Sequence, residues 1–335
     1  MIRIPKKIAS ALYNRLTLRA QRGPIRIGLI GVGGWGASNA VSIMRRRRFT
    51  IAGVHDAQNS VAERFARRFK TRCFDTREEL LSNPEIQAIC ITVPNHLHGE
   101  MVRACAEAGK AIFIEKPLAS SADECGALAQ CCEEHGVLLQ VGHQMRREPV
   151  IRAMKHELES GAYGTPLYAH GVYTLERQQR DDWRKDARLC PGGSMEQLGI
   201  HLVDALVYLF GVPRHSSGWA RNIPATEDGP DWGSVSMEFD DDVRATVSAS
   251  FSSPRHLEMT VFCEHGELST DGTVLRLMQN GIEKRPMRMP ETPGSVAQFI
   301  AFADSIENGA ISETGAAEAQ AVMNVIESMG GGFRV

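Results

Sequence analysis

Residues 25–36 of this 335-residue chain read IRIGLIGVGGWG, and they indicate its fold class. The first six of these residues are mostly apolar and predict a buried strand, and the next six fit the pattern G-x-G-x-x-G. In that pattern Gly31 permits a tight turn, Gly33 lets the backbone approach a pyrophosphate, and Gly36 lets the following helix lie close to the strand. A pyrophosphate would then meet the N–H groups at the start of that helix. The stretch therefore predicts the opening of a dinucleotide-binding domain.

An acidic residue at the end of the next predicted strand extends this pattern. Asp56 lies twenty residues beyond Gly36, where a carboxylate accepts hydrogen bonds from the adenosine ribose and repels a 2′-phosphate. Residues 57–59 are Ala, Gln and Asn, and none is the arginine that receives the extra phosphate of NADP. The alternative is a glycine-rich turn beside a solvated aspartate. We predict that NAD, rather than NADP, binds to Gly31, Gly33, Gly34, Trp35, Gly36 and Asp56.

Residues 24–146 alternate between two kinds of segment. Apolar, β-branched runs predict strands at Ile25–Ile30, Thr50–His55, Ala88–Val93, Ala111–Ile114 and Val137–Val141. Stretches with helical periodicity lie between them, at Ser60–Phe69, Leu97–Ala108 and Ser121–His135. Continuous apolar strands joined by helices are typical of a parallel sheet covered on both faces. We predict a doubly wound α/β domain of the Rossmann type.

After residue 146 the pattern changes. Helices are predicted at Val150–Gly161, Met195–Phe210 and Gly315–Met329, and Gly211 is expected to end the second one in the left-handed conformation. Alternating strands are predicted at Val235–Phe239, Val243–Phe251, Leu257–Cys263 and Glu267–Thr270. Residues 147–335 are therefore predicted to form an α+β domain with a largely antiparallel, open sheet.

The first residues of the chain are strongly basic. Residues 1–55 hold eleven Lys or Arg and no acid. Within residues 1–23, Ile8, Leu12 and Leu16 recur at helical spacing, which predicts an amphipathic arm that packs on a partner subunit. A membrane-surface helix and a transit-like peptide are the alternatives.

The composition excludes several classes of protein. Apolar residues make up 43% and charged residues 23%, as in ordinary globular proteins, and the net charge of −2 is too balanced for a dedicated nucleic-acid binder. No window approaches the ~18 consecutive apolar residues of a membrane-spanning helix. The eight cysteines form no C-x-x-C pair, and we interpret them as reduced thiols of a cytoplasmic protein.

Three further motifs carry a family resemblance. They are TVPNHLH at residues 92–98, EKP at 115–117 and GGSMEQLGIHLVD at 192–204. Together with the glycine-rich turn, and in this order, they resemble the Gfo/Idh/MocA family of NAD(P)-dependent oxidoreductases, which includes glucose-fructose oxidoreductase and inositol dehydrogenase. The resemblance covers residues 24–330.

The EKP motif follows a predicted strand, and ligands of an open parallel sheet bind beyond the carboxyl ends of its strands. Lys116 is therefore expected beside the nicotinamide. There it would either lose its proton more readily than a surface lysine or hydrogen-bond a substrate oxygen and stabilise a developing alkoxide. The resemblance implies that the Lys116–Pro117 bond is cis and that further cofactor contacts come from Pro94, Asn95, His98 and Glu115.

The third motif supplies a candidate base. Gln197, His201 and Asp204 share one face of the predicted helix. Oxidation of an alcohol requires loss of its hydroxyl proton, and a histidine suits that task, so His201 is the predicted base. Inositol-dehydrogenase-like members place an aspartate where this chain has Gln197, whose neutral amide can orient the imidazole or bind a hydroxyl but cannot stabilise an imidazolium. Asp204 would supply that charge or would only cap and pack.

Other polar residues are candidates for substrate contact: Gln140, His143, Arg147, Trp183, Arg184 and Asp204. Trp183 and Arg184 lie in a basic stretch with Arg177, Arg180 and Arg188, which suits an anionic substrate group. Because acids alternate with these bases, a self-paired solvated loop is the alternative. His96 and His98 have no third ligand at usable spacing, so no metal is predicted.

The residues and the resemblance together predict an NAD-dependent oxidoreductase that acts on a secondary hydroxyl or ketone of a sugar, polyol or related derivative. Two alternatives are an NAD-dependent glycosidase with transient redox chemistry and a non-catalytic dinucleotide-binding sensor. The resemblance also implies a homodimer or homotetramer formed through the open sheet.

Overall fold

The computed structural model describes residues 23–44, 47–176, 183–222, 231–284, 286–288 and 292–329. They form two compact units. Unit 1 contains the described residues up to Gly142 together with Ser295–Gln320, and unit 2 contains His143–Gly294 and the described residues from Ala321 onward. The sequence placed the boundary between residues 146 and 147 and assigned residues 295–320 to the second domain, whereas they pack in unit 1. Except for Gly23, the expected arm lies outside the described residues.

Unit 1 is built on a six-stranded parallel sheet in the order β3-β2-β1-β4-β5-β6. Its strands are β1 (Ile25–Ile30), β2 (Phe49–His55), β3 (Arg72–Cys73), β4 (Ala88–Ile91), β5 (Ala111–Ile114) and β6 (Leu139–Val141). All residues of β4 and β5 are apolar and buried, as a sheet covered on both faces requires. The predicted doubly wound fold is confirmed, and the short β3 is an addition to it.

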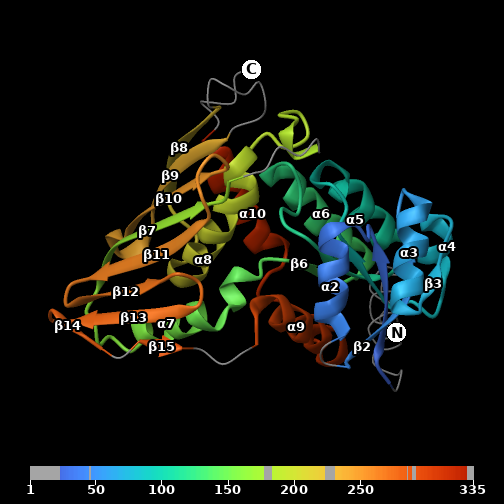
Figure 1. Ribbon diagram of the computed structural model, residues 1–335, viewed down its shortest axis with the longest axis horizontal. Helices are drawn as coiled ribbons and strands as arrows, with labels where there is room; N and C mark the ends of the chain where they lie inside the picture. Colours follow the sequence, from blue (N-terminus) through green and yellow to red (C-terminus); the bar gives the residue numbers. More distant parts are fainter. Residues whose placement is uncertain are drawn as a thin grey trace, which may run out of the picture. The chain divides into compact units, whose positions relative to one another are not determined.

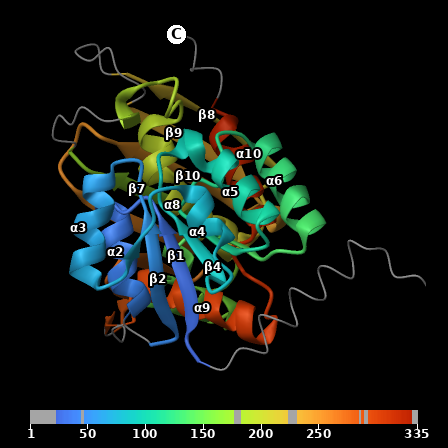
Figure 2. The ribbon, with the colours of Figure 1, turned by 90° about the vertical axis from the view of Figure 1, so that its right-hand side faces the viewer.

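Helices cover both faces of this sheet (Figures 1 and 2). They are α2 (Gly34–Met44), α3 (Asn59–Phe69), α4 (Arg77–Ser82), α5 (His98–Glu107) and α6 (Ala122–His135). Figure 2 shows α2 and α3 on one side of the strands and α5 and α6 on the other. The local signals are clear at α6, where the Ser121 side chain accepts a hydrogen bond from the Glu124 N–H and Gly136 ends the helix at a φ of 64°.

The helix α9 (Gly294–Asn308), which the sequence did not predict, explains why residues 295–320 belong to unit 1. Phe299 lies against Phe113 with a centroid distance of 4.4 Å, and Phe302 stacks on Phe49 at 6.0 Å. All four rings are buried. Burial of such large aromatic side chains fixes α9 on the same face of the sheet as α2 and α3.

Unit 2 contains a nine-stranded sheet among the described residues, with the order β14-β13-β12-β11-β7-β10-β9-β8 and β15 beside β13. The strands are β7 (Pro166–Thr174), β8 (His215–Arg221), β9 (Trp232–Glu238), β10 (Arg244–Ser250), β11 (His256–Cys263), β12 (Gly266–Thr270), β13 (Val274–Gln279), β14 (Ile282–Glu283) and β15 (Met287–Arg288). All pairs are antiparallel except β7 with β10. The predicted class of sheet is confirmed, although β7, β8 and β13–β15 were not predicted.

The remaining helices are α7 (Pro149–Glu159), α8 (Ile200–Phe210) and α10 (Ala316–Glu327). The expected single helix Met195–Phe210 is instead a π-helical turn, Met195–Gly199, followed by α8, because the Ile200 N–H bonds to the Met195 carbonyl five residues back. Gly211 ends α8 at a positive φ of 88°, but its ψ of −167° is not the left-handed helical value that was expected. No helix of the described ranges is long and apolar enough to cross a bilayer.

Candidate functional site

The glycine-rich turn contains glycines in crowded positions and glycines in open positions. A Cβ on Gly31, whose φ is +81°, would lie 2.8 Å from the Thr92 carbonyl oxygen, and one on Gly36 would lie 2.3 Å from the Gly31 oxygen. Both positions are closed by the protein itself. At Gly33 and Gly34, by contrast, an added Cβ would meet no heavy atom within 4 Å. This open side of the turn fits the pyrophosphate of a dinucleotide, which needs close access to the backbone.

The start of α2 is suited to an anion. The helix begins at Gly34, directly after the open position, and its first turn contains no acidic residue. The first N–H groups of a helix have no partner within the helix, and the helix dipole favours negative charge there. Trp35, in the same turn, is 57% exposed. The predicted residues Gly33, Gly34 and Trp35 therefore form an exposed surface at the helix start.

Asp56 is tied to this turn. Its Oδ2 accepts a hydrogen bond of 2.8 Å from the Val32 N–H, and its Oδ1 accepts one of 2.9 Å from the Gln58 N–H. The carboxylate thus fixes the end of β2 against the glycine-rich turn, and each oxygen retains a lone pair for a ribose hydroxyl. This role in shaping the turn was not predicted from the sequence.

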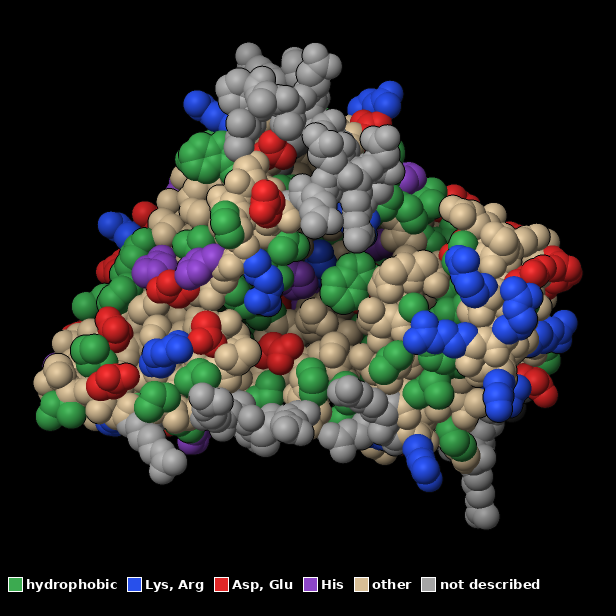
Figure 3. Space-filling view, in the orientation of Figure 1, with side chains coloured by type: hydrophobic (Ala, Val, Ile, Leu, Met, Phe, Trp, Pro, Cys, Tyr) green, Lys and Arg blue, Asp and Glu red, His purple; other side chains and the backbone are tan. Residues whose placement is uncertain are grey.

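The residues directly after Asp56 are neutral, although the helix that follows them is rich in arginine. Figure 3 shows Lys and Arg side chains gathered over the region of α3, the helix that follows Asp56. In α3 itself, Arg67 and Arg68 occupy the last turn, at the opposite end from Asp56. The exposed residues 57–59 beside Asp56 carry no positive charge.

The loops after β4 and β5 lie at one edge of the sheet, because these neighbouring strands are parallel. Pro94 and Asn95 are in the first loop, and Glu115 and Lys116 are in the second. The Lys116–Pro117 bond is cis, as the resemblance implied. Strand order reverses between β1 and β4, which is the switch point where ligands of such sheets bind.

His98 is placed differently from the exposed residues of the glycine-rich turn. Its side chain is buried, with Nδ1 2.6 Å from the Pro117 carbonyl oxygen and Nε2 3.0 Å from the Val93 carbonyl oxygen. Burial lowers the pKa of His98 to about 4, so the ring is neutral near pH 7. A neutral imidazole has a single N–H, so the ring donates a hydrogen bond to one of these two carbonyl oxygens. His98 thus links the two loops.

The candidate base belongs to unit 2. His201 is in the first turn of α8, partly buried, with its ring centroid 6.3 Å from that of Tyr173 on β7. Gln197 lies in the π-helical turn, and its Nε2 is 3.5 Å from the Cys190 sulfur. The π-turn therefore replaces the regular helix on which the spacing of these residues was interpreted.

Asp204 is fully buried and binds Arg146. Arg146 Nε donates to Asp204 Oδ2 at 3.0 Å, and its Nη2 forms the second arm of the pair with Oδ1. The Nδ1 atom of His143, also buried, lies 3.5 Å from Oδ1. These contacts join α8 to the segment before α7.

The other predicted substrate residues belong to both units. Gln140 is fully buried in unit 1, where its amide donates to the Gln298 carbonyl at 2.7 Å and accepts from Ser312. Arg147 is also buried, and the Arg184 guanidinium lies 4.4 Å over the Trp183 ring. Arg177 and Arg180 lie outside the described residues.

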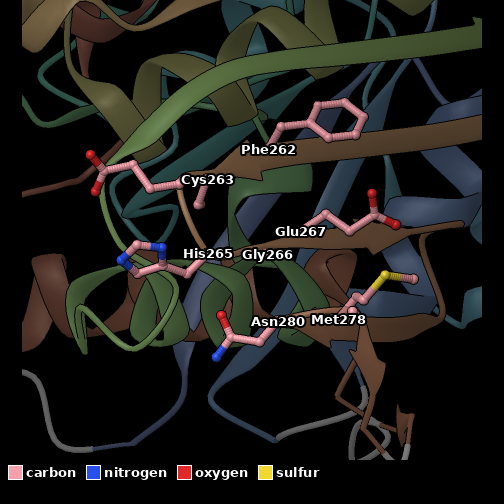
Figure 4. A pocket seen from close by; sticks show the side chains of 9 residues that line it. Phe262, Cys263, His265, Gly266, Glu267, Met278 and Asn280 are labelled. Atoms are coloured by element: carbon pink, nitrogen blue, oxygen red, sulfur yellow. The ribbon is translucent and has the colours of Figure 1, made fainter.

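A hollow in unit 2 lies at the β11–β12 turn and is lined by Phe262, Cys263, Glu264, His265, Gly266, Glu267, Met278, Asn280 and Gly281. Figure 4 shows the His265 and Glu267 side chains pointing in opposite directions. The polar groups do not converge, so this hollow has no arrangement for chemistry.

Comparisons with known proteins agree with both units. Residues 25–143 match the family described as "Oxidoreductase family, NAD-binding Rossmann fold", and residues 151–269 match the "GFO/IDH/MocA C-terminal domain". The chain is 31% identical over 239 residues to scyllo-inositol 2-dehydrogenase (NAD(+)) of Bacillus subtilis, covering 69% of this chain and 68% of that protein. It is 29% identical over 226 residues to levoglucosan dehydrogenase of Pseudarthrobacter phenanthrenivorans, covering 62% of this chain but only 57% of the relative.

The chain also matches relatives whose names specify NADP. D-xylose 1-dehydrogenase [NADP(+)] of Haloarcula marismortui is 28% identical over 267 residues, which are 76% of this chain and 72% of that protein. Among solved structures, levoglucosan dehydrogenase in complex with NADH and levoglucosan superposes with a TM-score of 0.84 at 20% identity, covering 92% of this chain and 96% of that one. This likeness shows a shared fold.

Proposed function

Because the chain belongs to the Gfo/Idh/MocA family of NAD-binding oxidoreductases, we propose that it oxidises a secondary hydroxyl, or reduces the ketone, of a sugar, polyol or related derivative. The observation that carries the proposal is the open side of the glycine-rich turn at Gly33 and Gly34, at the same sheet edge as Lys116. The substrate class is supported by relatives named for levoglucosan, scyllo-inositol and D-xylose.

The nicotinamide, when bound, accepts or donates the hydride. Oxidation of the alcohol also releases its hydroxyl proton, which His201 would accept while Lys116 stabilises the negative charge that develops on the oxygen. Gln197 would orient the imidazole or hold a neighbouring hydroxyl. In the reductive direction His201 returns the proton to the same oxygen.

The test is to monitor NADH absorbance with a panel of sugars, polyols and nucleotide sugars, in parallel with p-nitrophenyl glycosides. The proposal expects substrate-dependent formation of NADH. Release of nitrophenol without accumulation of NADH would instead identify an NAD-dependent glycosidase. Dinucleotide binding with no turnover in either assay would identify a sensor.

For the cofactor we propose NAD over NADP. The support is Asp56, whose carboxylate would repel a 2′-phosphate, together with the absence of a cationic side chain at residues 57–59. Titration with both dinucleotides tests this, and NADP should bind at least tenfold more weakly. The double variant Asp56→Ser, Ala57→Arg should narrow or reverse the preference, and tighter binding of NADP by the native chain would refute the proposal.

We also propose a homodimer or homotetramer formed through the outer face of the unit 2 sheet. Its support is two aromatic pairs on this face: the exposed Trp219 and Trp232 form a T-shaped pair with centroids 4.6 Å apart, and the exposed Tyr168 stacks on the half-buried Phe262 with centroids 6.2 Å apart. Aromatic residues are enriched in protein interfaces. Light scattering of the native chain and of Trp232→Arg tests this, with a lower mass expected for the variant. A monomeric native chain would refute it.

A cytoplasmic location is proposed from the thiols. All eight cysteines lie in the described ranges, none is in a disulfide, and six are buried. Burial raises the pKa of Cys105 and of Cys132 to about 12, so these thiols are protonated and pack as small apolar groups. Reduced thiols of this kind are typical of proteins in reducing compartments.

A further inference from the structure

The two residues that flank Lys116 are each held by a side chain from a helix. On one side, Asn39 Nδ2 donates a hydrogen bond of 2.7 Å to Glu115 Oε1. On the other, the His98 ring contacts the Pro117 carbonyl at 2.6 Å. Asn39 and His98 are 2% and 1% exposed. Neither contact involves Lys116 itself, yet both restrain the backbone that carries it.

The Asn39 contact connects two parts of the candidate site. Asn39 lies on α2, the helix that begins at the glycine-rich turn, and Glu115 immediately precedes Lys116. The cofactor would bind at the start of α2, so the bond ties the helix of the cofactor-binding turn to the residue before the lysine. The pairing of β1, β4 and β5 fixes the strands, and this contact, between residues 76 positions apart in the chain, adds a direct link between the helix and the loop.

The Glu115 carboxyl has little freedom to move. A Cβ on Gly142 would lie 3.2 Å from Glu115 Oε2, which limits the space beside the second oxygen. Burial raises the pKa of Glu115, whereas the bond from Asn39 and the nearby Lys116 charge favour the carboxylate. The Lys116 backbone also hydrogen-bonds this carboxyl, so Asn39 supplies one of its stabilising contacts, and its loss would destabilise the carboxylate.

We propose that Asn39 is a positioning residue that, through Glu115, holds Lys116 at a fixed place relative to the cofactor-binding turn. This proposal rests on the proposed function, in which Lys116 acts on the substrate oxygen. A displacement of about 1 Å in a reacting group can lower a rate by about a hundredfold. Loss of the bond should therefore reduce kcat, with little change in KM or in NADH affinity.

The test is an exchange of the two groups. In Asn39→Asp, two carboxyls face each other, and at a pH where both are ionised the bond is lost, so kcat measured there should fall by about ten- to a hundredfold. In the double variant Asn39→Asp, Glu115→Gln, the amide and the carboxylate have exchanged places and one N–H···O bond is restored. Its kcat should rise at least several-fold above that of Asn39→Asp. Thr71→Val, which removes the bond from Thr71 to the Ile51 carbonyl elsewhere in unit 1, is the matched control and should keep native kcat.

A second measurement does not depend on turnover. The rate at which Lys116 is labelled by an amine-directed reagent, followed by peptide mass spectrometry, reports its placement in each variant. Asn39→Asp should change this rate, and the exchange variant should restore it. Failure of the exchange to restore either kcat or the labelling rate overturns the positioning role. Absence of turnover in the native chain, with the labelling pattern intact, would refute the proposed function alone.

Discussion

The two units hold their candidate site residues in different ways. In unit 1 the glycine-rich turn and the lysine loop are fixed by hydrogen bonds between side chains and backbone, as with Asp56 to Val32 and His98 to Pro117. In unit 2 the helix that carries His201 is fixed by a buried ion pair, Arg146 with Asp204. A single hydrogen bond contributes about 1 kcal/mol, whereas breaking a buried ion pair leaves an uncompensated charge, although Arg152 and Lys155 also contact α8 through Tyr208. Removing one contact should therefore lower the unfolding free energy by different amounts in the two units.

The largest effect should follow from breaking the ion pair. Asp204→Asn leaves the Arg146 guanidinium buried without its counter-charge, and loss of one partner of a buried pair costs about 3–5 kcal/mol of unfolding free energy. Urea unfolding measures this. As a control, Glu85→Gln removes the exposed pair with Arg26 and should cost less than about 1 kcal/mol. Equal losses for the two variants would show that the Asp204 pair is not the main anchor of α8.

The next largest effect is expected on the reaction rate, in the variant Lys116→Ala. If Lys116 stabilises the developing alkoxide, its removal should lower kcat by about 10²–10³-fold. The affinity for NADH should stay nearly unchanged, because the lysine is not part of the glycine-rich turn. Steady-state kinetics and a fluorescence titration measure the two quantities, and a fully active variant would contradict the assigned role.

The contribution of His98 to stability depends on pH. Its pKa is about 4 in the folded chain and about 6.5 when the chain unfolds, so below pH 6.5 the unfolded state takes up a proton that the folded state resists. The contribution of neutral His98 to the unfolding free energy is therefore fully present above pH 6.5. It decreases by about 3 kcal/mol in total as the pH falls toward 4. The native unfolding free energy should decline over that range, and less so in His98→Asn. If the unfolding free energies of the native chain and of His98→Asn change with pH in the same way, His98 is not a buried neutral histidine.

The units also differ in how far the sequence predicts them. The strands around the glycine-rich turn could be predicted because continuous β-branched runs and spaced glycines are local signals. The π-turn at Met195–Gly199 has no such signal, since the residues also suit an α-helix. Long-range partners were missed as well: Asn39 with Glu115 and Arg146 with Asp204 are separated by 76 and 58 positions. The helix α9 was not predicted from the sequence, so residues 295–320 were assigned to the domain that precedes them in the chain, although Phe299 and Phe302 pack in unit 1.

The smallest predicted effect comes from comparing two glycines of the glycine-rich turn. Gly33→Ala adds a methyl group where no atom lies within 4 Å, so the unfolding free energy should change by less than about 0.5 kcal/mol. The same methyl group occupies the space that fits a pyrophosphate, so the affinity for NADH should fall by about tenfold, which corresponds to about 1.4 kcal/mol. Gly36→Ala is the opposite case, because its Cβ would lie 2.3 Å from the Gly31 oxygen, and it should destabilise the fold. Binding and unfolding measured on both variants separate the two roles. If Gly33→Ala binds NADH as tightly as the native chain, the pyrophosphate does not lie at the open side of the turn.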